Sequence, residues 1–247
     1  MAITSLYGYQ LVKGTIYQTK TINKFGFNDA VGTSKQTISD VGSNYTNLTV
    51  AQSLNVSSSN TNDTSGGTGA RTLILYGIDG DYNEISETIT LNGQTNVATS
   101  KSYLRLYRAK VLTAGSGATA AGDIYVGYGT NTAGVPATPL IKIVTGENQT
   151  LMACWTVPVG YTGYLYTCTF SSGSETGQKY MIARLEVKEY GSVWQTKEKG
   201  TFSTANLVFS RDIPLQIPEK SDIRLTAQTS SGTFDVSGVF ALVYEKN

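Results

Sequence analysis

The segment DGDYNE carries the residues whose spacing comes nearest to a metal site. Asp79, Asp81 and Asn83 fall at alternate positions, as the first oxygen ligands of a calcium-binding loop do. The sixth position is Glu84 instead of the glycine that the sharp turn of such a loop needs, and the twelfth is Thr90 instead of a bidentate glutamate. We therefore expect a hairpin turn with solvated acids and no bound metal.

Two further patterns could suggest an enzyme. Glu84 and Glu87 could be the paired carboxylates of a glycosidase, but residues three apart on a strand point to opposite faces. The glycine-rich segment SGGTGAR (residues 65–71) lacks the Lys-Ser/Thr of a phosphate-binding loop, and we expect it to lead into a strand. The chain contains no histidine, which removes Ser-His-Asp catalysis, Cys-His catalysis and His-bound metals. We expect no enzyme, no catalytic residue and no cofactor.

The cysteines and tryptophans each have two possible roles. Cys154 and Cys168 lie in neighbouring expected strands, and a hairpin centred near Tyr161 could bring them together; we expect two buried, reduced thiols. Trp155, Trp194 and the tyrosines could stack on sugars. Such rings more often belong to a core or to an interface, which is what we expect.

The charge balance argues against two classes of partner. Lys and Arg number 19 against 18 Asp and Glu, which gives a net charge of +1. No basic surplus is available to neutralise a phosphate backbone or an anionic membrane surface, so we expect neither nucleic acid nor membrane as a partner. The sequence shows no signal peptide and no long apolar run, so we expect a soluble chain that is made in a cytoplasm.

Apolar residues recur with a period of two and not with helical spacing. In KYMIARLEVKEY, Met181, Ala183, Leu185 and Val187 face one way and the charged residues face the other. Similar short runs are separated by turn signals of the Asp-Gly and Asn-Gly kind. Many short strands at near-regular spacing predict an all-β fold, of the antiparallel β-sandwich or jelly-roll type.

Three regions of the chain differ in texture. Residues 1–50 are polar and weakly patterned, so we expect an extended N-terminal arm. Residues 51–145 hold a first β-sandwich region and residues 146–247 a second, jelly-roll-like one; whether these form one domain or two stays open. Some apolar side chains of the arm lack the periodicity of a core and are candidates for an interface: Leu6, Tyr7, Tyr9, Leu11, Phe25 and Phe27.

Several short patterns occur together downstream of the arm. They are Asp63-Thr64 before the glycine-rich turn, Gly69-Ala70-Arg71 at the start of a strand, Leu91-Asn92-Gly93, and the runs QTLMACWTVPVGYTGYL and IPEKSDIRLTA. These patterns resemble those of virion structural proteins of tailed phages, especially the capsid-decoration or fibre-like proteins of marine and cyanobacterial phages. The resemblance covers most of residues 50–245.

The resemblance implies a place in the virion after synthesis in the host cytoplasm. We expect a capsid decoration or cement protein that stabilises the phage head through protein–protein contacts. Its partners would be the major capsid protein or other virion proteins, and by analogy with decoration proteins it would be a homotrimer. The alternative is a tail or fibre component that contacts the host cell surface through tyrosine-rich loops. A high copy number per particle would indicate cement, and a low one would indicate a tail component.

Overall fold

The chain is built almost entirely of antiparallel strands. The computed structural model describes residues 8, 10–173, 179–203 and 206–247. Strands account for 58% of the residues and helix for 2%. The predicted all-β class with antiparallel sheets is therefore confirmed. Among the described residues, no helix is long and apolar enough to cross a membrane.

The strands belong to two compact units. The first unit comprises residues 1–25, 31–35 and 153–247, and the second comprises residues 26–30 and 36–152. In the sequence, the second unit is thus an insertion into the first. The predicted boundary near residue 146 lies close to the return into the first unit at residue 153. The predicted boundary at residue 50 does not match a boundary of either unit.

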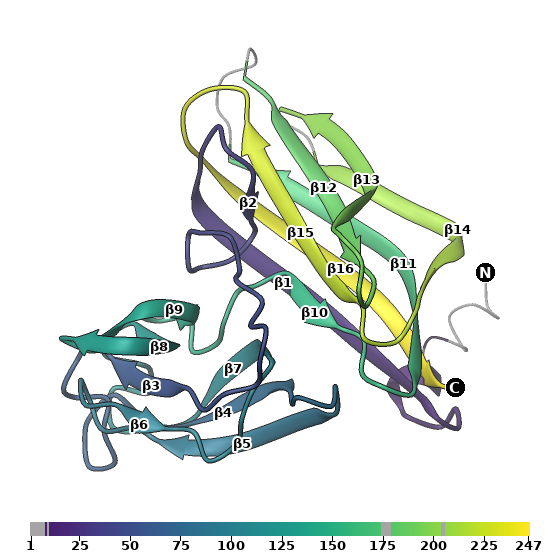
Figure 1. Ribbon diagram of the computed structural model, residues 1–247. Coiled ribbons are helices and arrows are strands. Elements are labelled where there is room, and N and C mark those ends of the chain that lie inside the picture. The colour runs from purple at the N-terminus through teal and green to yellow at the C-terminus, as the bar shows by residue number, and fades with distance from the viewer. Residues whose placement is uncertain (1–7, 9, 174–178, 204–205) are drawn as a thin grey trace. The chain divides into compact units, whose positions relative to one another are not determined.

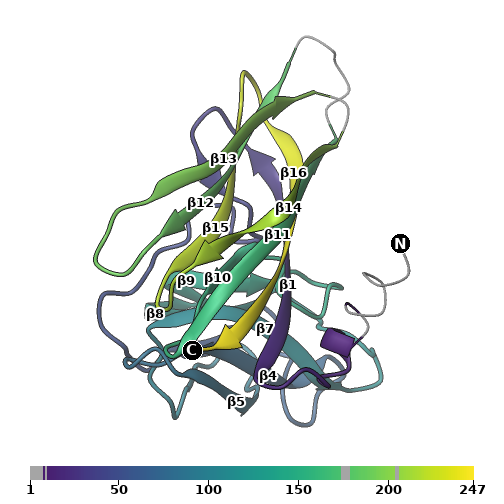
Figure 2. The same ribbon diagram turned by 90° about the vertical axis from the view of Figure 1, so that its right-hand side faces the viewer.

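The first unit contains two antiparallel sheets, with the strand orders β1-β16-β11-β14 and β10-β15-β12-β13 (Figure 1). Figure 2 shows these two sheets as two layers. Their strands are β1 (Thr19–Val31), β10 (Cys154–Thr156), β11 (Tyr161–Ser172), β12 (Met181–Lys188), β13 (Gln195–Phe202), β14 (Leu207–Ile217), β15 (Asp222–Thr229) and β16 (Phe234–Lys246).

The pairings in the first unit are nested. Taken in chain order, its eight strands pair first with last (β1 with β16), second with seventh (β10 with β15), third with sixth (β11 with β14) and fourth with fifth (β12 with β13). Two further pairings, β11 with β16 and β12 with β15, join these pairs into the two sheets. The unit is therefore one long folded-back ribbon of paired strands.

The core of the first unit follows the period-two pattern. Met181, Ala183, Leu185 and Val187 of β12 are all buried, as the alternation predicts. The two sheets meet through aromatic rings: the ring of Trp155 on β10 lies 4.9 Å from that of Tyr244 on β16, measured between centroids. Tilted aromatic pairs at this distance stabilise a core beyond the area they bury.

The second unit also contains two antiparallel sheets, with the orders β6-β3-β8-β9 and β5-β4-β7. The buried residues of β4, which include Leu73, Leu75 and Ile78, contribute to its core. The strands of these two sheets are β3 (Asn55–Ser58), β4 (Ala70–Ile78), β5 (Glu84–Thr90), β6 (Val97–Ala98), β7 (Arg105–Ala114), β8 (Ile124–Thr132) and β9 (Val135–Ile143). The short β2 (Gln36–Thr37) falls among the residues of this unit but belongs to neither of its two sheets.

A buried carboxylate holds the loops of the second unit together. Asp63 is fully buried and its two side-chain oxygens accept four hydrogen bonds. The donors are the Ser58 hydroxyl (2.6 Å) and the backbone N–H groups of Ala70 (2.6 Å), Ala121 (2.8 Å) and Gly122 (3.0 Å). A side chain at Gly69 would lie 2.2 Å from Asp63 Oδ1, so only glycine fits there. This network gives the Asp63 and Gly69-Ala70 patterns a structural role.

The predicted N-terminal arm is wrong for residues 19–31. These residues form β1, which pairs with β16 at the edge of a sheet of the first unit. The alternation in β1 was hidden because its buried positions include Lys24, Gly26 and Asn28, which are polar or lack a side chain. The sequence of this strand alone therefore does not predict that it is part of a core.

We predict that Asp63→Ala destabilises the second unit by about 3 kcal/mol or more, because it leaves several buried N–H groups without an acceptor, at about 1–3 kcal/mol each. Chemical denaturation followed by fluorescence measures the effect. Asp81→Ala is the matched control, since Asp81 is exposed and its change should cost little. Equal stability of the two variants would contradict this role for Asp63.

Candidate functional site

An ionic cluster lies on β12 and β15 of the first unit. Glu186 and Arg224 are directly opposite each other in the β12–β15 ladder. Arg224 Nε donates a hydrogen bond to Glu186 Oε2 at 2.8 Å, and Lys35 Nζ donates to Glu186 Oε1 at 2.6 Å. The hydroxyl of Thr226 also reaches Oε2, at 3.4 Å. Both carboxylate oxygens are therefore satisfied, although Glu186 is only 2% exposed.

A tryptophan covers the arginine of this cluster. The guanidinium carbon of Arg224 lies 3.9 Å from the centroid of the Trp194 ring. Arginine is suited to this position because its planar group can stack on an aromatic face while its N–H groups bind a carboxylate. Trp194 is half-buried, so this ring belongs to a packed cluster and is not a free stacking platform.

The charge of Glu186 is held by its partners. Burial alone would raise the pKa of this carboxyl, but the hydrogen bonds and positive charges of Lys35 and Arg224 outweigh burial and lower the pKa below its ordinary value of 4.5. Glu186 therefore remains ionised at neutral pH. The cluster links β12 to β15 and, through Trp194, contacts the loop that follows β12.

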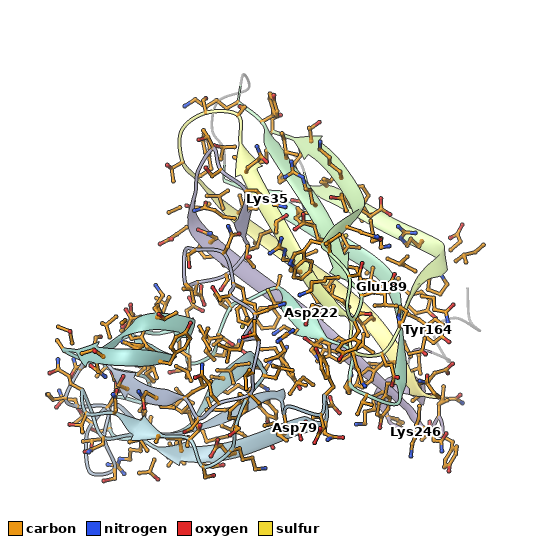
Figure 3. The ribbon with its side chains drawn as sticks, viewed as in Figure 1. Lys35, Asp79, Tyr164, Glu189, Asp222 and Lys246 are labelled. Atoms are coloured by element: carbon orange, nitrogen blue, oxygen red, sulfur yellow. The ribbon has the colours of Figure 1, made fainter. Side chains whose placement is uncertain are left out.

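That loop, residues 189–194, is the most exposed apolar feature beside the cluster. Glu189, labelled in Figure 3, opens it, and the Ser192 N–H donates back to the Glu189 carbonyl at 2.9 Å. Tyr190 is 68% exposed and Val193 is 72% exposed. The ammonium group of Lys220 lies 5.4 Å from the centroid of the Tyr190 ring. An exposed aromatic and aliphatic pair on a defined turn is suited to contact with another macromolecule.

The free edges of the two sheets are less suited to such contact. β13 lies at one edge and carries Lys197, Glu198 and Lys199 in succession. β14 lies at the edge of the other sheet and contains Pro214, which has no N–H to donate. Charged residues and proline are the usual means by which edge strands resist pairing with another chain. Contact through loops or sheet faces therefore fits this unit better than strand addition.

A small polar pocket lies within the second unit. Its volume is about 90 Å³, and its lining includes Phe27, Asp29, Asp40, Lys142 and Glu147. Asp40 is the buried member, and its Oδ2 accepts the N–H of Leu151 at 2.7 Å. Burial raises the pKa of Asp40 from 3.8 to about 7, with Glu147 and Asp29 raising it further and the Leu151 hydrogen bond and Lys142 lowering it.

The DGDYNE segment forms a turn. Asp79, labelled in Figure 3, lies at its start. Its Oδ1 accepts hydrogen bonds from the backbone N–H groups of Asp81 and Asn83, both at 2.9 Å. The Asn83 amide also donates to Asp79. The carboxylate of Asp79 is thus used to close the turn between β4 and β5. Within the described part of the chain, no group of three or more His, Cys, Asp or Glu side chains is arranged to hold a metal ion.

The two carboxylates considered for a glycosidase pair lie on one strand. Glu84 and Glu87 both lie on β5, three residues apart, and Glu87 Oε2 accepts hydrogen bonds from the N–H and hydroxyl of Ser100 at 2.9 and 2.7 Å. Arg71 Nε, at the end of the glycine-rich segment, donates to the Gly67 carbonyl at 3.0 Å. The Glu87 carboxylate therefore fixes the chain at Ser100, and the Arg71 side chain fixes the glycine-rich segment.

The six interface candidates of the N-terminal region have different outcomes. Leu6, Tyr7 and Tyr9 lie outside the described residues. Leu11 is buried, and Phe25 and Phe27 are half-buried. The structure places Phe27 in the lining of the Asp40 pocket.

The cysteines and Trp155 are interior residues. Both cysteines are free thiols and both are buried. Burial raises the pKa of Cys154 and of Cys168 to about 12, so neither is a reactive thiolate. Trp155 is fully buried and cannot stack on a sugar.

Sequence analysis missed Asp40 and Glu186 as sites, since a single acid in a strand or loop carries no signal of a distant partner.

Comparison with known proteins gives no family. No protein-family model and no curated protein matches the chain. Three solved structures of infectious bursal disease virus resemble it distantly: the Gt strain, the Gx strain and a VP2 subviral particle. Their identities are 11%, 11% and 9%, and their TM-scores are 0.19, 0.22 and 0.20. The matches cover 92%, 94% and 98% of this chain and 74%, 78% and 82% of those chains. TM-scores this low do not establish a shared fold, so the function must be argued from the chain itself.

We predict that Glu186→Gln destabilises the first unit by about 3 kcal/mol at pH 7, because breaking a buried ion pair leaves its cations uncompensated. Since the folded-state pKa of Glu186 is lowered, its contribution is present above the ordinary value of 4.5 and is lost as pH falls through the folded value. Denaturation at pH 7 and at pH 3 should therefore give a difference between variant and wild type that shrinks in acid.

Glu189→Gln is the control for this measurement. Glu189 pairs with Lys197 at 3.9 Å on the surface, where such a pair contributes about 0–1 kcal/mol. An equal loss from both variants would mean that the buried cluster is not important for stability.

Proposed function

We propose that this chain is a structural protein of a virus particle and that its first unit is a jelly roll. The nested pairing of eight strands carries the proposal. A jelly roll consists of eight antiparallel strands in two sheets, and it is a recurrent architecture of virus capsid domains, lectins and cupins. The pairing of first with last, second with seventh, third with sixth and fourth with fifth strand supports this assignment.

The other uses of the jelly roll fit this sequence less well. Metal-dependent enzymes built on such barrels rely on clustered metal-ligating side chains, histidine above all. The chain has no histidine, and its two thiols are buried. A virion component needs a stable body and surfaces for assembly, with no catalytic group. The protected sheet edges of β13 and β14 are consistent with a body that must not pair indiscriminately through its edges.

Within the virion we propose the role of a capsid decoration or cement protein. Its partner would be the major capsid protein or another virion protein, and it would act as a homotrimer. The near-neutral charge supports docking through apolar and hydrogen-bonding contacts over attraction to nucleic acid. Four of the six interface candidates lie before β1, and we propose this segment as the attachment region.

A tail or fibre component is the second candidate, and one observation favours it. Large aromatic side chains are exposed on the first unit at Tyr166, Tyr180 and Tyr190. Tyrosine combines an apolar ring with a hydrogen-bonding tip, which suits contact with glycans or proteins at a cell surface. This role would use the same jelly-roll body but different neighbours in the particle.

We predict that a reconstruction of the purified virus particle finds this chain on the outer surface of the head in many symmetry-related copies. Gold-labelled antibody against the first unit gives an independent localisation. Density confined to the tail in few copies would support the fibre role instead. Absence of the chain from purified particles would reject both forms of the proposal.

We further predict that deletion of residues 1–14 abolishes binding to particles that lack the protein while leaving the chain folded. The deletion spares β1, which begins at Thr19, and circular dichroism and thermal melting check that the fold persists. A longer deletion through residue 36 is the contrasting variant, and it should unfold the first unit because β1 is lost. Unchanged binding by the shorter deletion variant would contradict attachment through this segment.

A further inference from the structure

Three segments of the second unit meet at one residue. The carbonyl of Leu151 accepts hydrogen bonds from the N–H of Phe27 at 3.3 Å and from the N–H of Asp40 at 3.1 Å. The N–H of Leu151 donates in turn to the Asp40 carboxylate, Oδ2, at 2.7 Å. Asp40 thus binds both backbone groups of Leu151: its own N–H donates to the Leu151 carbonyl, and its carboxylate accepts from the Leu151 N–H. We call these contacts the Asp40–Leu151 junction.

The junction lies at the ends of the unit's chain. The second unit enters at residues 26–30, resumes at residue 36 and ends at residue 152. Phe27 belongs to the first of these stretches, Asp40 follows the resumption by four residues, and Leu151 precedes the end by one. Asp40 is therefore the side chain that ties the last residues of the unit to the first.

The surroundings of Asp40 penalise a negative charge. Its exposed fraction is 9%. The charged side chains that line its pocket are Asp29 from β1, Lys142 from β9 and Glu147 from the turn that follows β9. Two of these three are acids, and the ammonium group of Lys142 also lies 4.0 Å from the carboxylate of Asp123. Burial and like charge therefore outweigh the single cation.

We propose that the Asp40–Leu151 junction is a proton-controlled clamp, which is closed while Asp40 is protonated and is loosened when Asp40 loses its proton to solvent. The neutral carboxyl can still accept the Leu151 N–H through Oδ2, so the closed junction keeps all of its hydrogen bonds. The ionised carboxylate gains further hydration when residues 149–152 move away from it, so loss of the proton favours the open junction. This inference concerns the second unit alone and does not depend on the proposed role in a virion.

The size of the effect follows from proton linkage. Burial raises the pKa of Asp40 from 3.8 to about 7. In the open junction the carboxyl is solvated and regains its ordinary pKa, so opening releases one proton between these two values. The equilibrium constant for opening should then rise up to about tenfold for each pH unit between pH 4 and 7, and level off above pH 7.

Amide hydrogen exchange measures the opening directly. The full-length protein is followed by NMR from pH 5 to pH 8, and the rates at Phe27, Asp40 and Leu151 are corrected for intrinsic exchange at each pH. We expect the protection factors at these amides to fall by up to about tenfold per pH unit and to reach a plateau above pH 7. The amides of the β3–β8 ladder report on the rest of the unit and should keep their protection.

Substitutions identify the titrating group. Asp40→Asn keeps the size of the side chain and an oxygen acceptor, so its junction should stay protected at every pH. Glu147→Gln removes a charge that disfavours ionisation and should shift the midpoint to lower pH. Lys142→Met removes the cation that favours ionisation and should shift the midpoint to higher pH. The opposite shifts expected from these two variants hold even if Asp40→Asn fails to fold.

Any of four results would overturn the clamp. The first is pH-independent protection of the junction in the wild-type protein. The second is pH dependence that persists unchanged in Asp40→Asn. The third is a midpoint that neither Glu147→Gln nor Lys142→Met moves. Equal loss of protection in the β3–β8 ladder would also reject a local clamp, since it would indicate unfolding of the whole unit.

Discussion

The pairing of β1 with β16 is the constraint on which the first unit depends. These are the first and the last strands of the chain, and every other pair of the unit is nested between them. Each strand then has its backbone groups satisfied by a partner whose position in the sequence is fixed by the nesting. Most of the second unit, residues 36–152, can occupy the sequence between β1 and β10 because the nesting requires only the order of the strands and no particular loop length.

Buried carboxylates play different parts in the two units. Asp63 is surrounded by donors and fixes loops, and Glu186 is neutralised by Lys35 and Arg224 and fixes strands. Asp40 has one good donor and two acids nearby, so its charge is poorly compensated. Burial therefore accompanies two well-partnered structural supports and one poorly partnered group whose pKa is raised to about 7. The number and kind of partners, more than burial itself, determine which role a buried acid takes.

The sequence predicted the strands well where both faces differ in polarity. KYMIARLEVKEY, with its buried Met181 and Leu185, is such a strand. The period-two pattern failed to predict β1, because the inward positions of this strand include Lys24 and Asn28. It also could not predict the ion pairs and junctions, because their members are far apart: Lys35 and Glu186 are separated by 151 positions, and Asp40 and Leu151 by 111. The types of residue were visible in the sequence, but their neighbours were set by the nesting of the strands.

The nesting also sets an order of events during synthesis of the chain. The last residue of the second unit, Met152, leaves the ribosome well before β16, so the second unit can fold while the first is still incomplete. β1 must wait for its partner until the final strand has been made, and contacts so distant in sequence are slow to form. The polar inward positions Lys24 and Asn28 then have a second benefit, because polar side chains at these positions make the waiting strand less prone to aggregate.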